Sequence, residues 1–157
     1  MAVHKVPRVP VLANKTKAAF SSRRLVRDVL VGLTPSDEQI IRAVTSGLVS
    51  AVLDDLVDCG LSIDEIAGVV GVSKRTLHRK RASHVLLDVA ESDRTIRLAR
   101  IIADADTSIG DHTKALHWLR TPNWALGNAV PLHLLATEPG VEMVRQSLAT
   151  IAFGGVA

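Results

Sequence analysis

Residues 62–82 read SIDEIAGVVGVSKRTLHRKRA, and this stretch predicts two short helices joined by a tight turn. Ser62 followed three residues later by Glu65 forms a capping box, which begins the first helix. Gly71 ends that helix, because glycine readily adopts the left-handed conformation of a tight turn. Ser73 can cap the second helix. The spacing therefore predicts a helix-turn-helix.

Apolar residues occur where the two helices of such a motif must touch. Ala67 is a small residue that lets the second helix approach, and it lies four positions before Gly71. The remaining joint positions are all apolar, namely Ile66, Val70, Val72 and Leu77. An ordinary helical hairpin with a polar exterior is the alternative, and the capped, basic second helix favours a helix-turn-helix.

The second helix, expected at about residues 74–81, is rich in basic side chains. Residues 72–87 contain five Lys or Arg residues and no acidic residue. The N-terminal part of such a helix faces base edges in the major groove, where arginine can bridge the two acceptors of guanine and Lys or Thr can hold phosphate. The candidate DNA-binding residues are Ser73, Lys74, Arg75, Thr76, His78, Arg79 and Arg81.

The rest of the chain also shows helical periodicity, without the sustained alternation of a strand. Of the 157 residues, 47% are hydrophobic and only 3% are aromatic, so the core must be aliphatic. We therefore predict an all-α protein, in which a helix-turn-helix-containing region is followed by a small helical domain. Further helices are expected at residues 20–33, 35–59, 89–106, 111–119, 131–135 and 139–153.

Two apolar stripes precede the helix-turn-helix. They consist of Leu25, Val29 and Leu33, and of Ile41, Val44, Leu48, Val52 and Leu56. Thr34 can cap the helix that carries the second stripe, with Pro35 in its first turn. Because the stripes exceed what two helices need to cover a small core, we expect a homodimer, which would match a two-fold operator.

Charge is distributed unevenly along the chain, although the net charge is only +3. Residues 1–27 carry seven Lys or Arg residues and no acidic residue. This block is either a polyanion contact or a solvated face. Its first part, residues 1–19, is interrupted by two prolines, and we expect it to form a flexible basic arm. The acidic side chains of Asp54 and Asp55 are expected on exposed helix faces.

The sequence shows no catalytic or metal-binding pattern. The single cysteine, Cys59, excludes an intramolecular disulfide and a cysteine-based metal site, and it fits a reducing cytoplasm. No two of the six histidines have the four-residue spacing of a zinc-binding helix. Phosphate-loop and nucleophile-elbow motifs are missing, and no apolar run reaches membrane-spanning length. We expect neither an enzyme nor a bound cofactor or metal, and no membrane contact.

The C-terminal part carries a distinctive pattern. Residues 118–127 read WLRTPNWALG, and residues 131–140 read PLHLLATEPG. These two motifs, in this order, resemble the toxin-binding domain of Xre/MbcA/ParS-type antitoxins. Residues 91–94 and the turn at residues 71–77 also resemble this family. The resemblance covers roughly residues 60–157, and residues 20–60 less closely.

The resemblance implies a type II antitoxin whose partner is a RES-domain toxin that destroys NAD. It further implies that the antitoxin represses its own operon and that its C-terminal segment occludes the active site of the toxin. Two departures affect this segment: Asn128 takes the place of a glycine, and the tail lacks a second aromatic residue. The implied toxin-binding residues are Trp118, Pro122, Asn123, Trp124, Leu126, Phe153, Gly154, Gly155, Val156 and Ala157.

Some of these residues have a purely structural alternative. Trp118 can anchor the core, Trp124 can cover the core or anchor an interface, and the tail can fray as termini do. The expected organisation is a basic arm over residues 1–19, a dimerisation and DNA-binding region over residues 20–85, and a toxin-binding domain over residues 86–157. The alternative function is a helix-turn-helix transcription regulator whose C-terminal domain senses a small molecule.

Overall fold

The structure is a computed structural model that describes residues 22–154. The expected basic arm and the tail residues Gly155, Val156 and Ala157 lie outside the described residues. Every regular element in the described part is helical, which confirms the predicted all-α class. Its β-type pairing is restricted to two isolated bridges, one of which joins Val49 to Leu86.

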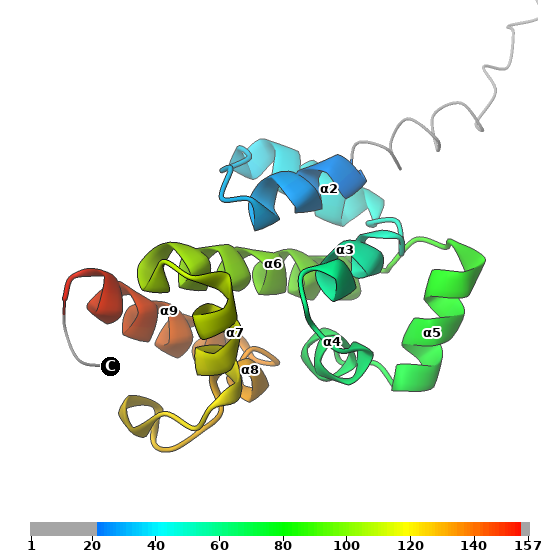
Figure 1. The fold of residues 1–157 in the computed structure, drawn as a ribbon. Helices are drawn as coiled ribbons and strands as arrows, with labels where there is room; N and C mark the ends of the chain where they lie inside the picture. Colours follow the sequence, from blue (N-terminus) through cyan, green and yellow to red (C-terminus); the bar gives the residue numbers. More distant parts are fainter. Residues whose placement is uncertain (1–21, 155–157) are drawn as a thin grey trace, which may run out of the picture.

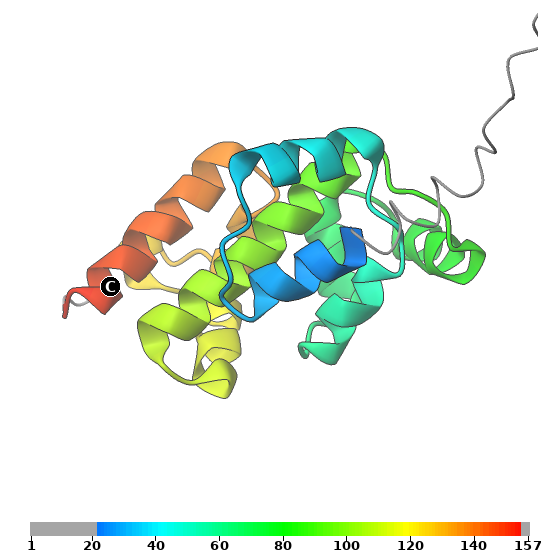
Figure 2. The same ribbon diagram turned by 90° about the horizontal axis from the view of Figure 1, so that it is seen from above.

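The central element is α6 (Val89–Ile109), a 21-residue helix along which the other elements are arranged (Figures 1 and 2). It packs against α2 (Asp37–Ser46), α4 (Ile63–Val70), α7 (His112–Arg120) and α9 (Glu138–Ala152). One continuous aliphatic core results, to which both halves of the chain contribute. The buried apolar side chains of α6 are Ile96, Leu98, Ala99, Ile101, Ile102 and Ala105.

The remaining elements surround this core. They are a helix over residues 22–30, α3 (Val52–Asp58), α5 (Lys74–Ser83), the 3-10 helix η1 (Trp124–Leu126) and α8 (Pro131–Leu134). In Figure 1, α5 stands at one end of the molecule and the C-terminal end of α9 at the other, with α8 between them. The predicted positions of the helices from α4 onward are confirmed to within three residues at each end.

The predicted single helix over residues 35–59 is wrong, because residues 47–51 between α2 and α3 are not helical. The main chain of this segment is hydrogen-bonded elsewhere. The Ser92 hydroxyl accepts the N–H of Leu48 at 2.9 Å, and the Leu48 carbonyl accepts the N–H of Leu87 at 2.8 Å. These partners lie about forty residues away in the chain, so local periodicity did not reveal them.

The start of α2 also differs from the prediction. Ser36, rather than Thr34, is the N-cap. Its hydroxyl accepts the N–H of Gln39 at 3.3 Å, and the Gln39 side chain accepts the N–H of Ser36 at 2.9 Å. A reciprocal capping box satisfies two main-chain donors, whereas a single cap satisfies one, and this determines where the helix begins.

The two apolar stripes lie mostly inside the core of the chain itself. Leu33 and Ile41 are exceptions, because both are exposed, and Ile40 faces the core in place of Ile41. The size of the stripes therefore no longer argues for a homodimer. The buried members are Leu25, Val29, Leu48, Val52 and Leu56.

A buried carboxylate on α3 holds the helix over residues 22–30. The Asp55 side chain, only 3% exposed, accepts hydrogen bonds from Arg23 Nε at 3.1 Å and from Arg27 Nε at 2.8 Å. Arg24 pairs with Asp28 at 3.7 Å. The prediction of an exposed Asp55 is thus wrong. The described part of the first basic block therefore contributes Arg23, Arg24 and Arg27, and all three form ion pairs within the protein.

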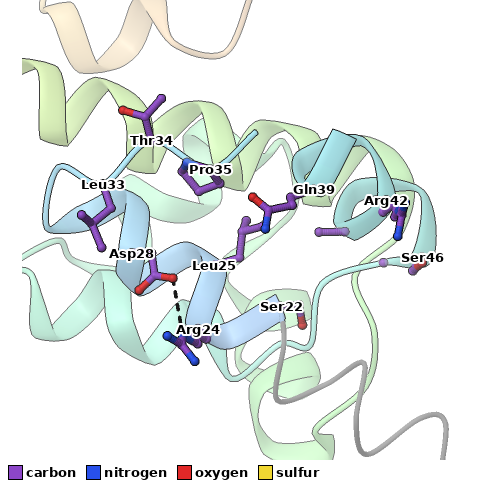
Figure 3. A pocket seen from close by; sticks show the side chains of 12 residues that line it. Ser22, Arg24, Leu25, Asp28, Leu33, Thr34, Pro35, Gln39, Arg42 and Ser46 are labelled. Carbon is purple, nitrogen blue, oxygen red and sulfur yellow. Dashed lines mark ion pairs between the residues drawn. The ribbon is translucent and has the colours of Figure 1, made fainter. Parts of the chain in front are cut away.

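A groove of about 750 Å³ lies between the helix over residues 22–30 and α2 (Figure 3). Its charged side chains already have partners: Arg24 pairs with Asp28, and Arg42 pairs with Glu38. A smaller groove, of about 480 Å³, lies between the ends of α6 and α9. The small-molecule alternative expects a pocket in the C-terminal region. The groove of about 750 Å³ lies outside that region.

Removing both arginines should destabilise the fold more than removing the carboxylate. The double variant Arg23→Ala/Arg27→Ala leaves Asp55 buried without a cationic partner, which costs about 3–5 kcal/mol. Asp55→Ala leaves two arginines that are 37% and 57% exposed and can turn toward water, so it costs about 1–2 kcal/mol. Urea unfolding measures both free energies.

The exposed pair of Arg24 and Asp28 supplies the matched control, because Arg24→Ala should cost less than about 1 kcal/mol. A greater loss for Asp55→Ala than for the double variant would contradict this account of the cluster.

Candidate nucleic-acid interface and partner-binding loop

Helices α4 and α5 form the predicted helix-turn-helix. Gly71 between them is left-handed, with φ 81°, and its N–H donates to the Ala67 carbonyl at 2.9 Å. Arg94 of α6 donates to the Val70 carbonyl at 2.9 Å and so caps the end of α4 from outside the motif. The predicted joint is confirmed: Ile66, Ala67, Val70 and Leu77 are buried, and Val72 is half-buried.

Both predicted N-caps of the motif are present. Ser62 and Glu65 form the capping box of α4, and the Ser73 hydroxyl accepts the N–H of Thr76 at 3.1 Å at the start of α5. The hydroxyls of Ser73 and Thr76 also lie 2.9 Å apart. These two predicted DNA-binding residues therefore shape the beginning of α5.

Two cations of α5 attach the helix to the rest of the protein. Lys80 Nζ lies 2.6 Å from a carboxylate oxygen of Glu91, and both side chains are largely buried. Arg81 Nε donates to Asp54 at 2.9 Å. Asp54 was expected to be solvated, and Arg81 was expected to contact DNA. The structure pairs them with each other, so Arg81 is not a free cation.

The exposed face of α5 carries the cations that remain. Within residues 22–154, Arg75, His78 and Arg79 are exposed and form no ion pair or side-chain hydrogen bond. Arg75 and Arg79 are four residues apart, so they lie on one face of the helix. Lys74 beside them pairs with Asp64 at 2.7 Å, and both of these side chains are exposed. This face is available to a polyanion.

The loop after α7 is organised by Asn123, which is buried. Its side chain accepts the N–H of Ala125 at 2.8 Å, and its N–H donates to the Ala129 carbonyl at 3.0 Å. Its own carbonyl accepts the N–H of Asn128 at 2.8 Å. Asn123 therefore fixes the shape of the loop, and the next residue, Trp124, lies at its surface with 68% of its area exposed.

The other predicted toxin-binding residues separate into two groups. Trp118 packs half-buried against the core and Leu126 is buried, so both have structural roles. Pro122, Phe153 and Gly154 are exposed. Trp124 is exposed and so does not cover the core. Met143 on α9 is also exposed.

The second C-terminal motif ends on a glycine for a steric reason. A Cβ atom at Gly140 would lie 2.0 Å from the carbonyl oxygen of Leu134. Helix α9 therefore lies so close to the end of α8 that only glycine fits at position 140.

Helix α7 contacts the turn between α3 and α4 through two side chains. His112 Nε2 lies 2.8 Å from the Cys59 carbonyl, and Arg120 Nη2 donates to the Gly60 carbonyl at 2.7 Å. The hydrogen bond to Cys59 and the carboxylate of Asp106 raise the pKa of His112 above 6.5, because both stabilise the protonated ring. The C-terminal half is thus attached to the helix-turn-helix half by side chains of α7.

Arg120 makes a further contact with the capping box of α4. Its Nε donates to Glu65 at 2.6 Å. This hydrogen bond lowers the pKa of Glu65 to about 2, despite partial burial of the carboxyl, and the N–H of Ser62 adds to the effect. Glu65 therefore both caps α4 and anchors the last residue of α7.

Within the described residues, no three His, Cys, Asp or Glu side chains are grouped to hold a metal ion. In the same part of the chain, no helix combines the length and apolar character that crossing a bilayer demands.

The fold and the two surfaces define an all-α helix-turn-helix protein with a second helical unit that presents an exposed aromatic loop. Comparison with known protein families agrees with this class. Residues 39–100 match the antitoxin Xre-like helix-turn-helix domain, and residues 104–154 match the antitoxin Xre/MbcA/ParS C-terminal toxin-binding domain.

Three curated relatives carry the name Antitoxin Xre. The protein from Pseudomonas putida is 31% identical over 119 residues, which cover 76% of this chain and 74% of the relative. The Yersinia enterocolitica protein is 34% identical, over 57% of this chain and 70% of its own length. The Photorhabdus laumondii protein is 30% identical, over 59% and 64%. The chain belongs to the Xre antitoxin family.

The contact between Arg120 and Glu65 should make stability depend on acid pH. The pKa of Glu65 is lowered on folding from 4.5, so its contribution is complete above pH 5 and is lost as the pH falls toward 2. Glu65→Gln keeps the capping box but removes the charge. We expect it to cost about 1 kcal/mol at pH 7 and progressively less between pH 5 and pH 3, as measured by urea unfolding.

Glu38→Gln is the control, because Glu38 pairs with Arg42 on the exposed surface of α2. A difference between wild type and Glu65→Gln that is the same at pH 7 and pH 3 would refute the role of this ion pair.

Proposed function

We propose that the chain is the antitoxin of a type II toxin–antitoxin system, which binds its own promoter through α5 and neutralises a partner toxin through its C-terminal half. The single observation that carries the DNA role is the pair of exposed arginines, Arg75 and Arg79, on the second helix of the helix-turn-helix, which have no partner among residues 22–154.

The charge distribution of α5 supports this role. Lys80 and Arg81 are neutralised by carboxylates of the protein, so only the outward face of the helix presents free positive charge. A phosphate backbone attracts such a face, and arginine can read guanine in the major groove. Family membership agrees, because the matched domain is of the antitoxin Xre-like helix-turn-helix type. Binding to its own promoter would make the protein a repressor of its operon.

Arg75→Ala/Arg79→Ala should abolish most promoter binding while the fold is retained, because neither side chain belongs to the joint. Arg24→Ala/Arg42→Ala is the matched control: it removes the same charge from two exposed arginines that lie outside the helix-turn-helix. Fluorescence anisotropy with the DNA upstream of the gene measures both. Wild-type affinity should fall with salt at a log–log slope of about −0.9 per neutralised phosphate. Equal affinities for the two double variants would rule out α5 as the DNA contact.

The proposed toxin is a RES-domain enzyme that destroys NAD, as the family resemblance implies. A partner surface is supported by Trp124, since an exposed tryptophan on a loop of fixed shape is a typical interface anchor. We propose that Pro122, Phe153 and Gly154 belong to the same contact region. The chain would act by binding rather than by catalysis, and it would do so in the cytoplasm.

Trp124→Ala should weaken the toxin complex by at least about 2 kcal/mol, the loss that defines an interface hot spot. Isothermal titration with the toxin encoded beside the gene measures this. Ile41→Ala is the control, because Ile41 is equally exposed but lies on α2. Undiminished affinity of Trp124→Ala would remove this loop from the proposed interface.

Deleting residues 154–157 tests the occlusion mechanism. Residues 155–157 lie outside the described residues, and Phe153 follows the last turn of α9. The apolar stripe of α9 is untouched, so thermal stability and promoter binding should be unchanged. We expect the complex to persist but the toxin to consume NAD again, because two glycines remove side-chain bulk and so suit a narrow cleft. Full inhibition by the truncated protein would show that the tail is dispensable.

We also propose that the protein binds DNA as a homodimer, because a two-fold operator requires two recognition helices about one turn of DNA apart. The stripes predicted to form the dimer are used in the core, so another surface must supply the contact.

A further inference from the structure

The segment that joins α5 to α6 is an exposed apolar edge. Leu86 is 50% exposed and Val89 is 53% exposed, and Val85 between α5 and Leu86 is also exposed. Between Arg81 and Glu91 the only titratable side chains are His84 and Asp88. Withdrawing this surface from water therefore requires the desolvation of few charges.

One edge of this segment is paired and the other is open. The carbonyl of Val85 accepts the N–H of Ser50 at 2.9 Å, and the N–H of Leu87 donates to the Leu48 carbonyl at 2.8 Å. Leu86 lies between them, opposite Val49, so its own N–H and C=O point away from this partner. Within residues 22–154 neither group forms a hydrogen bond. An unpaired donor and acceptor beside exposed apolar side chains are a template for another strand.

We propose that this edge pairs with the same edge of a second copy of the chain, Leu86 opposite Leu86, across a two-fold axis. The inference rests on the proposed homodimer and identifies its surface. In an antiparallel pair each Leu86 donates its N–H to the other and accepts in return, so all four free groups are satisfied. A contact of this kind is isologous and closes after two copies, as a dimer requires.

The groups beside Leu86 are also complementary in hydrogen bonding. His84 ends α5 in the left-handed conformation, with φ 49°, and Asp88 is the N-cap of α6, so the ladder itself is limited to the residues between them. Antiparallel pairing about Leu86 turns the His84 end of each copy toward the Asp88 end of the other, and both side chains are exposed. Asp88 uses one carboxylate oxygen to cap α6, because Oδ1 accepts the N–H of Glu91 at 2.8 Å, and its second oxygen forms no hydrogen bond within the described chain. That oxygen can accept from a donor of the second copy.

The position of the axis limits the separation of the two recognition helices. Helix α5 has ten residues, so its centre lies about 7.5 Å from its C-terminal end. The three residues from Ser83 to Leu86 span at most about 10 Å. Two recognition helices therefore cannot lie farther apart than about 35 Å, so one turn of DNA, about 34–36 Å, is the upper limit of their spacing. The axis also lies at the end of the molecule opposite the C-terminal end of α9 (Figure 1), so dimerisation leaves Trp124 accessible.

Charge exchange at Leu86 tests the proposal. Leu86→Lys and Leu86→Glu each place like charges opposite each other across the axis, so each variant alone should dimerise at least tenfold more weakly than wild type. An equimolar mixture should recover dimers as heterodimers, which a merely misfolded variant would not do. Sedimentation equilibrium over a concentration series measures the dissociation constants. Ile41→Lys is the control, because it adds a charge at an exposed apolar residue on α2.

A disulfide trap gives a second measurement. Hydrogen-bonded antiparallel pairs have Cα atoms about 5.5 Å apart, within the range of a disulfide. In a Cys59→Ser background, Leu86→Cys should therefore crosslink under mild oxidation, whereas Ile41→Cys should not. A wild-type dimer that is unaffected by the Leu86 variants and is not trapped would overturn this surface but leave the homodimer standing. A wild type that stays monomeric at every concentration would overturn both, independently of the promoter binding tested at Arg75 and Arg79.

Discussion

The carboxylate of Glu91 joins the recognition helix to the centre of the protein, and the rest of the structure depends on this contact. It accepts the N–H of Asp88 at 2.8 Å, which begins α6, and it binds Lys80, which holds α5. The side chain is almost completely buried, so both partners are needed to compensate its charge. One side chain thus both caps the start of α6 and holds α5, so the orientation of α5 depends on where α6 begins.

The three residues after Glu91 extend this role. Ser92 accepts the N–H of Leu48 and so separates α2 from α3, and Arg94 caps the end of α4. Asp93 pairs with Arg97 one turn later at 2.6 Å. The first turn of α6 thereby contacts the segment between α2 and α3, the end of α4 and the side of α5. Residues 91–94, which resemble the antitoxin family, thus help to position the helix-turn-helix.

The DNA-binding half and the toxin-binding half are connected by side chains as well as by the core. Arg120 ends α7, immediately before the loop that carries Trp124, and it contacts both Gly60 and Glu65. His112 holds the neighbouring carbonyl of Cys59 from the other end of α7. The proposed toxin anchor is thus only a few residues from a contact with the first turn of α4. The cations of α5 lie on two faces of the helix. Lys80 and Arg81 face the protein, whereas Arg75 and Arg79 face outward.

Features that depend on neighbours a few residues away could be predicted from the amino-acid sequence. The capping box of Ser62 and Glu65, the turn at Gly71, the cap at Ser73 and the apolar joint were all predictable, because helix ends and helical faces are local properties. The two C-terminal motifs led to the correct family for the same reason. Only the tertiary structure decided which charges are free. Arg81 and Asp54 are 27 residues apart, and Arg23 and Asp55 are 32 apart. Sequence periodicity does not reveal a contact over such separations, so the cations that form ion pairs became distinguishable from those left exposed only when the helices were packed.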